Sequence, residues 1–177
     1  IHGGAGAGLQ EDGAEALERE IRHALADVLD ATAHLLSSGA AALEAVEDAV
    51  VRLEDSPLFN AGKGSVLNER GEFELDASIM DGRTLRAGAV AGLTTVKNPV
   101  RAARLVLERS PHVFLAGPGA EAFAAREGAE LVEPAYFETE RRRAAFEAAK
   151  RNAQRALPGD TGTVGAVALD VHGNLAS

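Results

Sequence analysis

Two stretches near the start of the chain carry apolar residues at helical spacing. From Gly13 to about Ser38 these positions recur every three or four residues, which predicts one long amphipathic helix ending at Gly39. A second stripe between residues 43 and 53 predicts another helix, which Pro57 prevents from continuing. The glycine-containing segment 59–65 then predicts a loop.

The middle of the chain changes to the alternation typical of strands. From residue 72 to 79 apolar side chains alternate with acidic or polar ones, which predicts a strand with one buried face. Asp81-Gly82 is a hairpin turn signal before the apolar run 87–96, so we expect an antiparallel pair. Asp76 and Asp81 would point to opposite faces of this strand, so they are not expected to form an acid and base pair.

Two further runs predict buried strands. The first, His112 to Ala116, is short and apolar, and a lone histidine there is more often a hydrogen-bonded core residue than a metal ligand. The second, residues 163–169, is followed by a turn and by Leu175, which begins its partner strand. His23 and His34 fall on the first predicted helix, where we expect surface or boundary positions.

Three more helices are expected between these strands. Asn98-Pro99 supplies an N-cap and a proline at the first helical position, so one helix begins there and ends near Ser110. Another is predicted from about residue 119 to 128. The stretch from about 139 to 154 is rich in arginine and glutamate with little apolar stripe, which predicts an exposed helix. This order of elements favours helices layered over an antiparallel sheet.

Composition narrows the class of protein. The chain has 177 residues, 46% of them hydrophobic and 25% charged, which is typical of a soluble globular domain. No apolar run approaches the roughly 20 residues that cross a bilayer, and the start lacks the features of a signal peptide, so we expect a cytoplasmic protein. The chain begins without Met and stops inside a strand-like run, so we expect a piece of a longer protein.

Charge and cysteine content limit the chemistry. The net charge is −9 and neither sign forms a long block, which argues against nucleic acid and anionic membranes as partners. A small-molecule or dipeptide substrate fits better. Because the chain has no cysteine, any nucleophile must be an oxygen or an amine.

Thr163 is the most informative candidate nucleophile, because the linker-like segment 157–162 leads directly into the strand that it begins. A threonine hydroxyl needs a base beside it, and a threonine at a chain N-terminus has its own α-amino group, with an ordinary pKa of about 7.7–8.0. Cleavage between Gly162 and Thr163 would create that amine, and glycine tolerates the strained backbone that such an attack requires. From composition alone, the alternative that Thr163 is merely a β-branched residue at a strand start is favoured.

Six motifs in chain order reverse that preference. They are His2-Gly3-Gly4-Ala5-Gly6, Phe59-Asn60-Ala61-Gly62-x-Gly64-Ser65-Val66-Leu67-Asn68, Glu74-Leu75-Asp76-Ala77-Ser78-Ile79-Met80-Asp81-Gly82, Val96-Lys97-Asn98-Pro99, Pro111-His112-Val113 and Gly162-Thr163-Val164-Gly165-Ala166-Val167. Together they closely resemble the plant-type L-asparaginase and isoaspartyl peptidase family of N-terminal-nucleophile hydrolases. The resemblance covers essentially the whole chain. It implies one incomplete domain, with residues 1–162 as the α-subunit region and 163–177 as the start of the β-subunit region.

The resemblance implies an αββα sandwich, autocatalytic cleavage at Gly162 before the nucleophile Thr163, and hydrolysis of asparagine and isoaspartyl peptides through an acyl-enzyme. No cofactor is needed for this chemistry. It further implies that the β-subunit segment stays bound after cleavage and that two such heterodimers associate. The family's second threonine motif, and the residues that hold the substrate's α-carboxylate and α-amino groups, would follow Ser177.

Other site residues are carried by the same resemblance. Asn60 matches an asparagine whose amide helps to hold the carbonyl oxygen as negative charge develops, although the residue taken alone favours a role in shaping a turn. Gly3 and Gly4 match a loop that packs close to the scissile bond. Six residues match positions whose main-chain carbonyls hold a structural sodium ion, namely Leu53, Glu54, Ser56, Phe59, Ala61 and Lys63.

Two alternative functions remain open. An amidase of the glycosylasparaginase type would use the same mechanism on a glycosylated asparagine. A non-catalytic module would bind a phosphate ligand through the glycine-rich start, or would serve as an interaction domain. The spacing around Gly3 to Gly8 argues against a phosphate loop, since neither Gly-Lys-Ser/Thr nor a suitably placed acidic residue follows.

Overall fold

The computed structural model describes residues 1–4, 14–151 and 162–177. Its helices are α1 (Ala14–Ser37), α2 (Ala42–Glu54), α3 (Pro99–Arg109), α4 (Gly117–Arg126) and α5 (Glu140–Arg151), with a short 3-10 helix η1 (Pro134–Phe137). Its strands are β1 (Leu75–Asp81), β2 (Arg86–Leu93), β3 (Phe114–Ala116), β4 (Ala168–Leu169) and β5 (Leu175–Ala176). None of the helices in these three stretches is long and apolar enough to cross a membrane.

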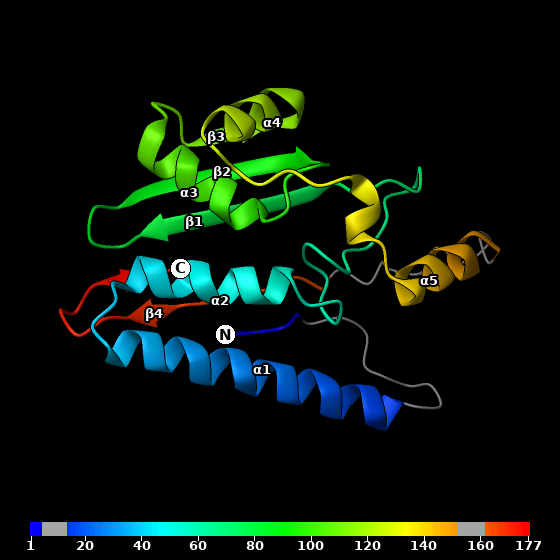
Figure 1. Cartoon of the computed structure of the whole chain (residues 1–177), viewed down its shortest axis with the longest axis horizontal. Coiled ribbons are helices and arrows are strands. Elements are labelled where there is room, and N and C mark those ends of the chain that lie inside the picture. The colour runs from blue at the N-terminus through cyan, green and yellow to red at the C-terminus, as the bar shows by residue number, and fades with distance from the viewer. Residues whose placement is uncertain (5–13, 152–161) are drawn as a thin grey trace.

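The strands form one sheet in the order β3-β2-β1-β5-β4 (Figure 1). The predicted antiparallel pair is confirmed as β1 and β2, and the predicted partner strand at Leu175 is confirmed as β5, antiparallel to β4. The expectation of an antiparallel sheet holds for three of the four pairings among the described strands, but β3 lies parallel to β2. A parallel neighbour needs a crossover connection, and α3 supplies it between these two strands.

Helices pack on one face of the sheet. Buried side chains of α2, α3, α4 and the strands form the main core, for example Val46, Val106 and Ile79, while α1 lies outside α2 (Figure 1). The described residues leave the opposite face uncovered. Four apolar side chains on that face are between 38% and 61% exposed, namely Met80, Phe114, Leu169 and Leu175.

Because this face is uncovered, two strands that the sequence predicted to be buried have exposed side chains. In β3, Phe114 is 56% exposed, and His112 just before it is exposed rather than part of the core. In the run 163–169 only Ala168–Leu169 is strand, and Val167 is 72% exposed. An apolar run shows that a strand has hydrophobic faces, but not which of them a neighbouring layer covers.

The start of α3 differs from its expected capping. Asn98 occupies the N-cap position, but its side chain does not cap the helix and instead donates to Asp55 Oδ1 at 3.0 Å. The backbone N–H of Val100 donates to Glu54 Oε1 at 3.0 Å. The Glu54 carboxyl group at the end of α2 therefore accepts from a free N–H at the start of α3, in place of the expected asparagine.

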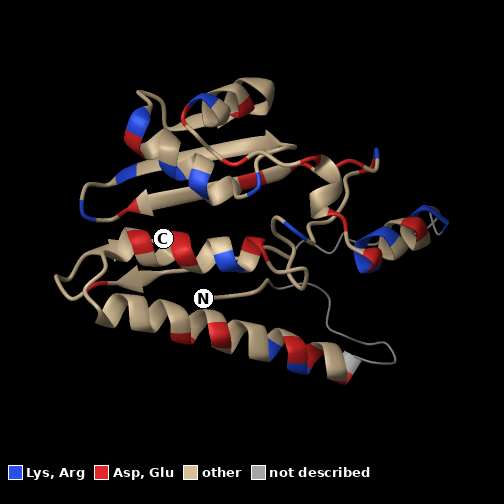
Figure 2. Ribbon diagram, viewed as in Figure 1, with Lys and Arg blue, Asp and Glu red and all other residues tan. Residues whose placement is uncertain are grey.

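The exposed helix expected over about 139–154 is observed as α5 up to Arg151, and the rest of that range lies outside the described residues. Figure 2 shows that both signs of charge lie along this helix, as they do along α1. Arg142 differs from the rest of this helix because it is buried, with only 7% of the residue accessible. His23 and His34 on α1 are exposed, as expected.

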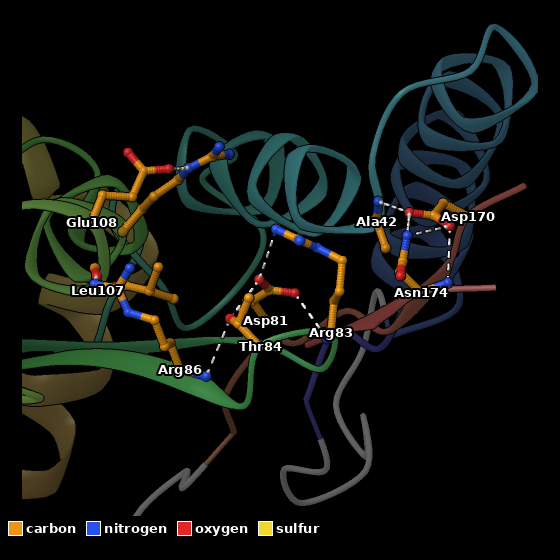
Figure 3. Close-up of polar contacts among 10 residues, drawn as sticks. Ala42, Asp81, Arg83, Thr84, Arg86, Leu107, Glu108, Asp170 and Asn174 are labelled. Carbon is orange, nitrogen blue, oxygen red and sulfur yellow. Dashed lines mark hydrogen bonds and ion pairs between the residues drawn. The ribbon is translucent and has the colours of Figure 1, made fainter. Parts of the chain in front are cut away.

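Asp170 joins the C-terminal hairpin to the start of α2 (Figure 3). Its Oδ2 accepts from the Ala42 N–H at 3.2 Å, and its Oδ1 accepts from the N–H groups of His172 and Asn174 at 2.9 Å each. These donors, with the Asn174 N–H as the largest contribution, lower the pKa of Asp170 to about 2. Since α2 has no side-chain cap of its own at Ala41, an acid 128 residues away from Ala42 in sequence caps it.

We expect the Asp170→Ala variant to melt roughly 2–8 °C below the wild type at neutral pH, because a helix cap and a turn organiser are lost together. The folded-state pKa lies below the unfolded value, so the carboxylate stabilises the fold above about pH 4 and loses this effect as the pH falls toward 2. Thermal melts of both proteins between about pH 2.5 and 7 test this. A difference in melting temperature that stays constant across that whole range would contradict it.

Candidate active site

The N-terminal residues lie beside the segment that contains Thr163. The N–H of His2 donates to the Gly165 carbonyl at 2.9 Å, and the N–H of Gly165 donates back to the His2 carbonyl at 3.1 Å. This antiparallel bridge fixes the segment 162–166 against the first four residues of the chain. Two segments that are distant in sequence thus meet at the candidate cleavage site.

Alternation along this extended segment directs Thr163 outward. Val164 and Ala166 pack against the second core cluster, which includes Leu53 and Phe59. In extended backbone, successive side chains point to opposite sides, so Thr163 faces away from that cluster and is exposed. It lies on a cavity of about 780 Å³ whose walls also come from α2, the 60–66 loop, β1 and the start of α3.

Asn60 is oriented toward the candidate scissile bond. Its side-chain Nδ2 donates to the carbonyl oxygen of Gly162, the residue before Thr163. Its Oδ1 accepts from the N–H of Val66 at 2.8 Å, which fixes the side-chain amide so that the nitrogen faces Gly162. The structure therefore places a hydrogen-bond donor at the oxygen that would become negative during attack on this carbonyl.

The two glycines of the N-terminal motif have different surroundings. Gly4 has a φ of +107°, and a Cβ there would lie 2.9 Å from the Thr163 carbonyl oxygen and 3.2 Å from the Gly162 Cα. A Cβ at Gly3 would lie 2.7 Å from a ring carbon of Phe59, so this glycine lets the segment pack on the Asn60 loop. Only glycine combines that φ with such a close backbone approach at Gly4.

We expect Gly4→Ala to slow any self-cleavage by at least about 10-fold, because strain of about 1–3 kcal/mol would displace the backbone next to Thr163. Gel electrophoresis of the incubated full-length protein measures the rate. Gly39→Ala is the matched control, since Gly39 also has a positive φ, +97°, but nothing lies within 4 Å of its added Cβ. Equal slowing in both variants would show that backbone strain alone, without contact at Thr163, explains the effect.

The loop after α2 brings several carbonyl oxygens close to its glycines. A Cβ at Gly62 would overlap the Glu54 carbonyl oxygen, and one at Gly64 would lie 2.6 Å from that of Pro57 and 2.9 Å from that of Phe59. The Glu54 carbonyl already accepts from the N–H of Lys63 at 2.7 Å. Only glycines fit between these oxygens. Main-chain carbonyl oxygens are of the type that binds a small hard cation.

Glu54 is the buried acid of this region, with 3% of the residue accessible, and it lines the same cavity as Thr163. Burial is the main cause that raises the pKa of its carboxyl to about 8, against the lowering effect of the Val100 N–H. Its Oε2 has no hydrogen-bond partner among the described residues. From sequence, only the main-chain carbonyl of this residue was expected to matter.

Two acids of β1 make hydrogen bonds within the sheet and its turn, and one of them, Asp76, also lines the cavity beside Thr163. Asp81 organises the hairpin turn, accepting from the Arg83 N–H at 3.0 Å and the Thr84 hydroxyl at 2.7 Å (Figure 3). Asp76 accepts from the Gly92 N–H at 2.8 Å. Within the described stretches, no group of three or more His, Asp or Glu side chains is arranged to hold a metal ion.

Two features of the site were not found from sequence. The Val66 N–H that orients Asn60 is a backbone group, which has no side-chain signature. Arg142 contacts the same loop through Gly64, but it is one of three consecutive arginines, so nothing in the sequence distinguished it from its more exposed neighbours. The Val66 contact lies within one loop, whereas the Arg142 contact joins segments that are 78 residues apart.

Comparison with known proteins shows the family to which the chain is related. A family model described as "Asparaginase" matches residues 1–177. The chain is 47% identical to the isoaspartyl peptidase of Escherichia coli (strain K12), covering 100% of this chain and 58% of that protein. It is 46% identical to the isoaspartyl peptidase/L-asparaginase of Rattus norvegicus, covering 99% and 53%, and 44% identical to that of Homo sapiens, covering 99% and 57%.

The chain therefore belongs to the asparaginase family described by that match. It spans a little over half the length of these curated relatives.

Proposed function

We propose that the protein is an autoprocessing threonine hydrolase that cuts itself between Gly162 and Thr163 and then hydrolyses isoaspartyl dipeptides and L-asparagine. The observation that carries this proposal is the hydrogen bond from the Asn60 amide to the Gly162 carbonyl oxygen, beside an exposed threonine. The names of the relatives support the substrate class.

Self-cleavage begins with attack of the Thr163 hydroxyl oxygen on the Gly162 carbonyl carbon. The carbonyl oxygen becomes an oxyanion, and the Asn60 amide stabilises it through the hydrogen bond already present. Collapse breaks the bond to the Thr163 nitrogen. The nitrogen takes one proton, which balances the proton that the hydroxyl loses on attack, and becomes an amine. Water then hydrolyses the resulting ester, so that Gly162 ends in a carboxylate and Thr163 recovers its hydroxyl.

Turnover repeats this chemistry on a substrate. The new α-amino group of Thr163 accepts the hydroxyl proton as the oxygen attacks the side-chain carbonyl of asparagine or of an isoaspartyl residue. The substrate carbonyl takes the place that the Gly162 carbonyl has left, so Asn60 serves both reactions. The proton passes to the leaving ammonia or amino acid, and water releases aspartate from the acyl-enzyme.

The activity is tested by incubating the full-length protein with L-asparagine, with an isoaspartyl dipeptide and with a glycosylated asparagine. We expect ammonia from the first and a free amino acid from the second. Hydrolysis of the glycosylated asparagine alone would favour the glycosylasparaginase alternative. No hydrolysis of any of the three by the self-cleaved protein would overturn the proposed function.

The proposed whole enzyme is an αββα sandwich. The uncovered sheet face, with Met80, Leu169 and Leu175 exposed, suits packing against a second sheet. Ser177 exchanges two backbone hydrogen bonds with Met80, at 2.7 and 3.1 Å, so a continuation of β5 would run along β1 beside the cavity. We propose that it does so, that residues 163–177 stay bound to 1–162 after cleavage, and that two heterodimers associate in the cytoplasm without nucleic acid or membrane.

No cofactor is needed for the proposed reaction, and we further propose that the loop after α2 holds a structural sodium ion. Main-chain oxygens of Leu53, Glu54, Ser56, Phe59, Ala61 and Lys63 would hold it. The carbonyls of two of these residues, Glu54 and Phe59, lie close to Gly62 and Gly64, which supports this proposal. A bound cation would stiffen the loop that presents Asn60.

If sodium binds there, the full-length protein should melt several degrees higher in sodium chloride than in choline chloride at the same ionic strength, since binding to the folded state alone stabilises it. Differential scanning calorimetry measures this. Equal melting temperatures in the two salts, from about 1 mM to about 300 mM, would remove the sodium proposal.

A further inference from the structure

The first turn of α5 contacts the loop that carries Asn60. Thr139 fixes the start of this turn, since its hydroxyl accepts from the Arg142 N–H at 3.2 Å and its carbonyl accepts from the Arg143 N–H at 3.0 Å. Arg142 points into the protein with 7% of the residue accessible, and it is the one buried residue of α5. Figure 1 shows α5 at one end of the molecule, apart from the other helices.

Arg142 acts on one side of the loop. Its Nε donates to the Gly64 carbonyl at 2.6 Å, while the Gly64 N–H donates to the Phe137 carbonyl at 3.0 Å. Both polar backbone groups of this glycine are thus bonded to the segment 137–142. A charge-assisted hydrogen bond from a buried guanidinium is stronger than a neutral one.

The other side of the loop is held by the neighbouring arginine. Arg141 donates to the Leu58 carbonyl at 2.9 Å. The segment 137–142 therefore contacts the chain on both sides of Asn60, at residues 58 and 64.

Hydrogen bonds within the loop connect the anchored Gly64 to the Asn60 side chain. Ser65 donates through its hydroxyl to the Gly62 carbonyl at 2.6 Å, next to the Gly64 that Arg142 holds. The following residue, Val66, supplies the N–H that orients the Asn60 amide. A displacement of Gly64 would therefore also move Val66, two residues further on, whose N–H fixes the direction of Asn60 Nδ2.

We propose that Arg142 is a positioning residue for the reaction, which holds the 58–66 loop so that Asn60 donates to the reacting carbonyl. This inference rests on the proposed function and adds a role for α5. Arg142 acts through its hydrogen bond to Gly64, and Asn60 is the residue that contacts Gly162. Its effect is on the rate of both reactions, because a misplacement of about 1 Å can cost about 100-fold.

The test compares Arg142→Met and Arg142→Lys with Arg143→Gln in the full-length protein. Arg143 is the matched control, since it lies next in the helix, is partly exposed and pairs with Glu138. We expect the rate constant for self-cleavage to fall about 10- to 100-fold in Arg142→Met, to recover in part in Arg142→Lys, and to stay unchanged in Arg143→Gln. A variant that is merely less folded would lose cleavage amplitude, not rate constant.

A double-mutant cycle with Asn60→Ala identifies the route of the effect. If Arg142 acts through Asn60, then Arg142→Met should slow cleavage much less when Asn60 is already alanine. After cleavage, kcat should fall in Arg142→Met while KM changes little, because the Asn60 donor acts on charge that develops in the transition state.

The outcomes separate this inference from the proposed function. If the wild type does not cleave itself, the proposed function fails. If the wild type cleaves and Arg142→Met cleaves with the same rate constant, or the Arg142→Met and Asn60→Ala effects are additive, only the role of Arg142 is overturned. Should Arg142→Met not fold, Arg142→Gln, which lacks the charge and the reach of arginine, decides, and a wild-type rate constant for cleavage in that variant would contradict the inference.

Discussion

Thr163→Ala should abolish self-cleavage and hydrolysis together. Alanine has no hydroxyl to attack the Gly162 carbonyl, and without cleavage no free α-amino group forms at position 163. Removing a nucleophile of this kind costs at least about 10⁴-fold in rate. Because the Thr163 side chain is exposed, the substitution should leave the melting temperature nearly unchanged. Mass spectrometry and an ammonia assay measure the two losses.

Thr163→Ser is the matched control for the nucleophile. It keeps the hydroxyl and removes only a methyl group, so self-cleavage and some activity should remain. Cleavage after Gly162 in the Thr163→Ala variant would show that another group attacks this bond, and the assignment of the nucleophile would then be wrong.

Asn60→Asp should slow self-cleavage by about 10²–10³-fold, which is the usual cost of one lost oxyanion donor. The aspartate can still accept from the Val66 N–H, so the loop keeps its anchor. It cannot donate to the Gly162 carbonyl, and its negative charge would oppose the developing oxyanion. Time courses of cleavage at about pH 7 to 8, where an ordinary aspartate is ionised, measure the effect.

Asn68→Ala controls for the loss of an asparagine elsewhere in the same region. Its Oδ1 accepts from the Arg70 and Glu72 N–H groups at 2.9 and 3.0 Å in a surface turn, outside the cavity. We expect a lower melting temperature and an unchanged cleavage rate constant. If Asn60→Asp cleaves as fast as Asn68→Ala, the Asn60 amide is not the donor that matters.

Local sequence patterns predicted the helices and the hairpin well. The stripe that ends near Ser38 and the Asp81-Gly82 signal depend on residues close in sequence, and α1 and the β1–β2 pair follow them. Burial was predicted less well. Phe114 and Val167 are exposed although their strands were expected to be buried, because an apolar pattern cannot show which layer is present.

The site depended on the family resemblance and on contacts that are distant in sequence. Asn60 and Gly162 are 102 residues apart, and by itself Asn60 was more simply explained as a turn residue. The resemblance indicated both residues, but not that the amide donates to the carbonyl of the intact bond. Nor could it indicate Arg142, because its contact is with a main-chain oxygen.

Cleavage of the bond before Thr163 by the protein itself is the step on which the proposed activity depends. It is tested most directly by purifying the full-length protein, incubating it without protease, and sequencing the N-terminus of each fragment that forms. We predict one new N-terminus that reads Thr-Val-Gly-Ala-Val. An uncut chain after prolonged incubation, or a new N-terminus at any other residue, would contradict it.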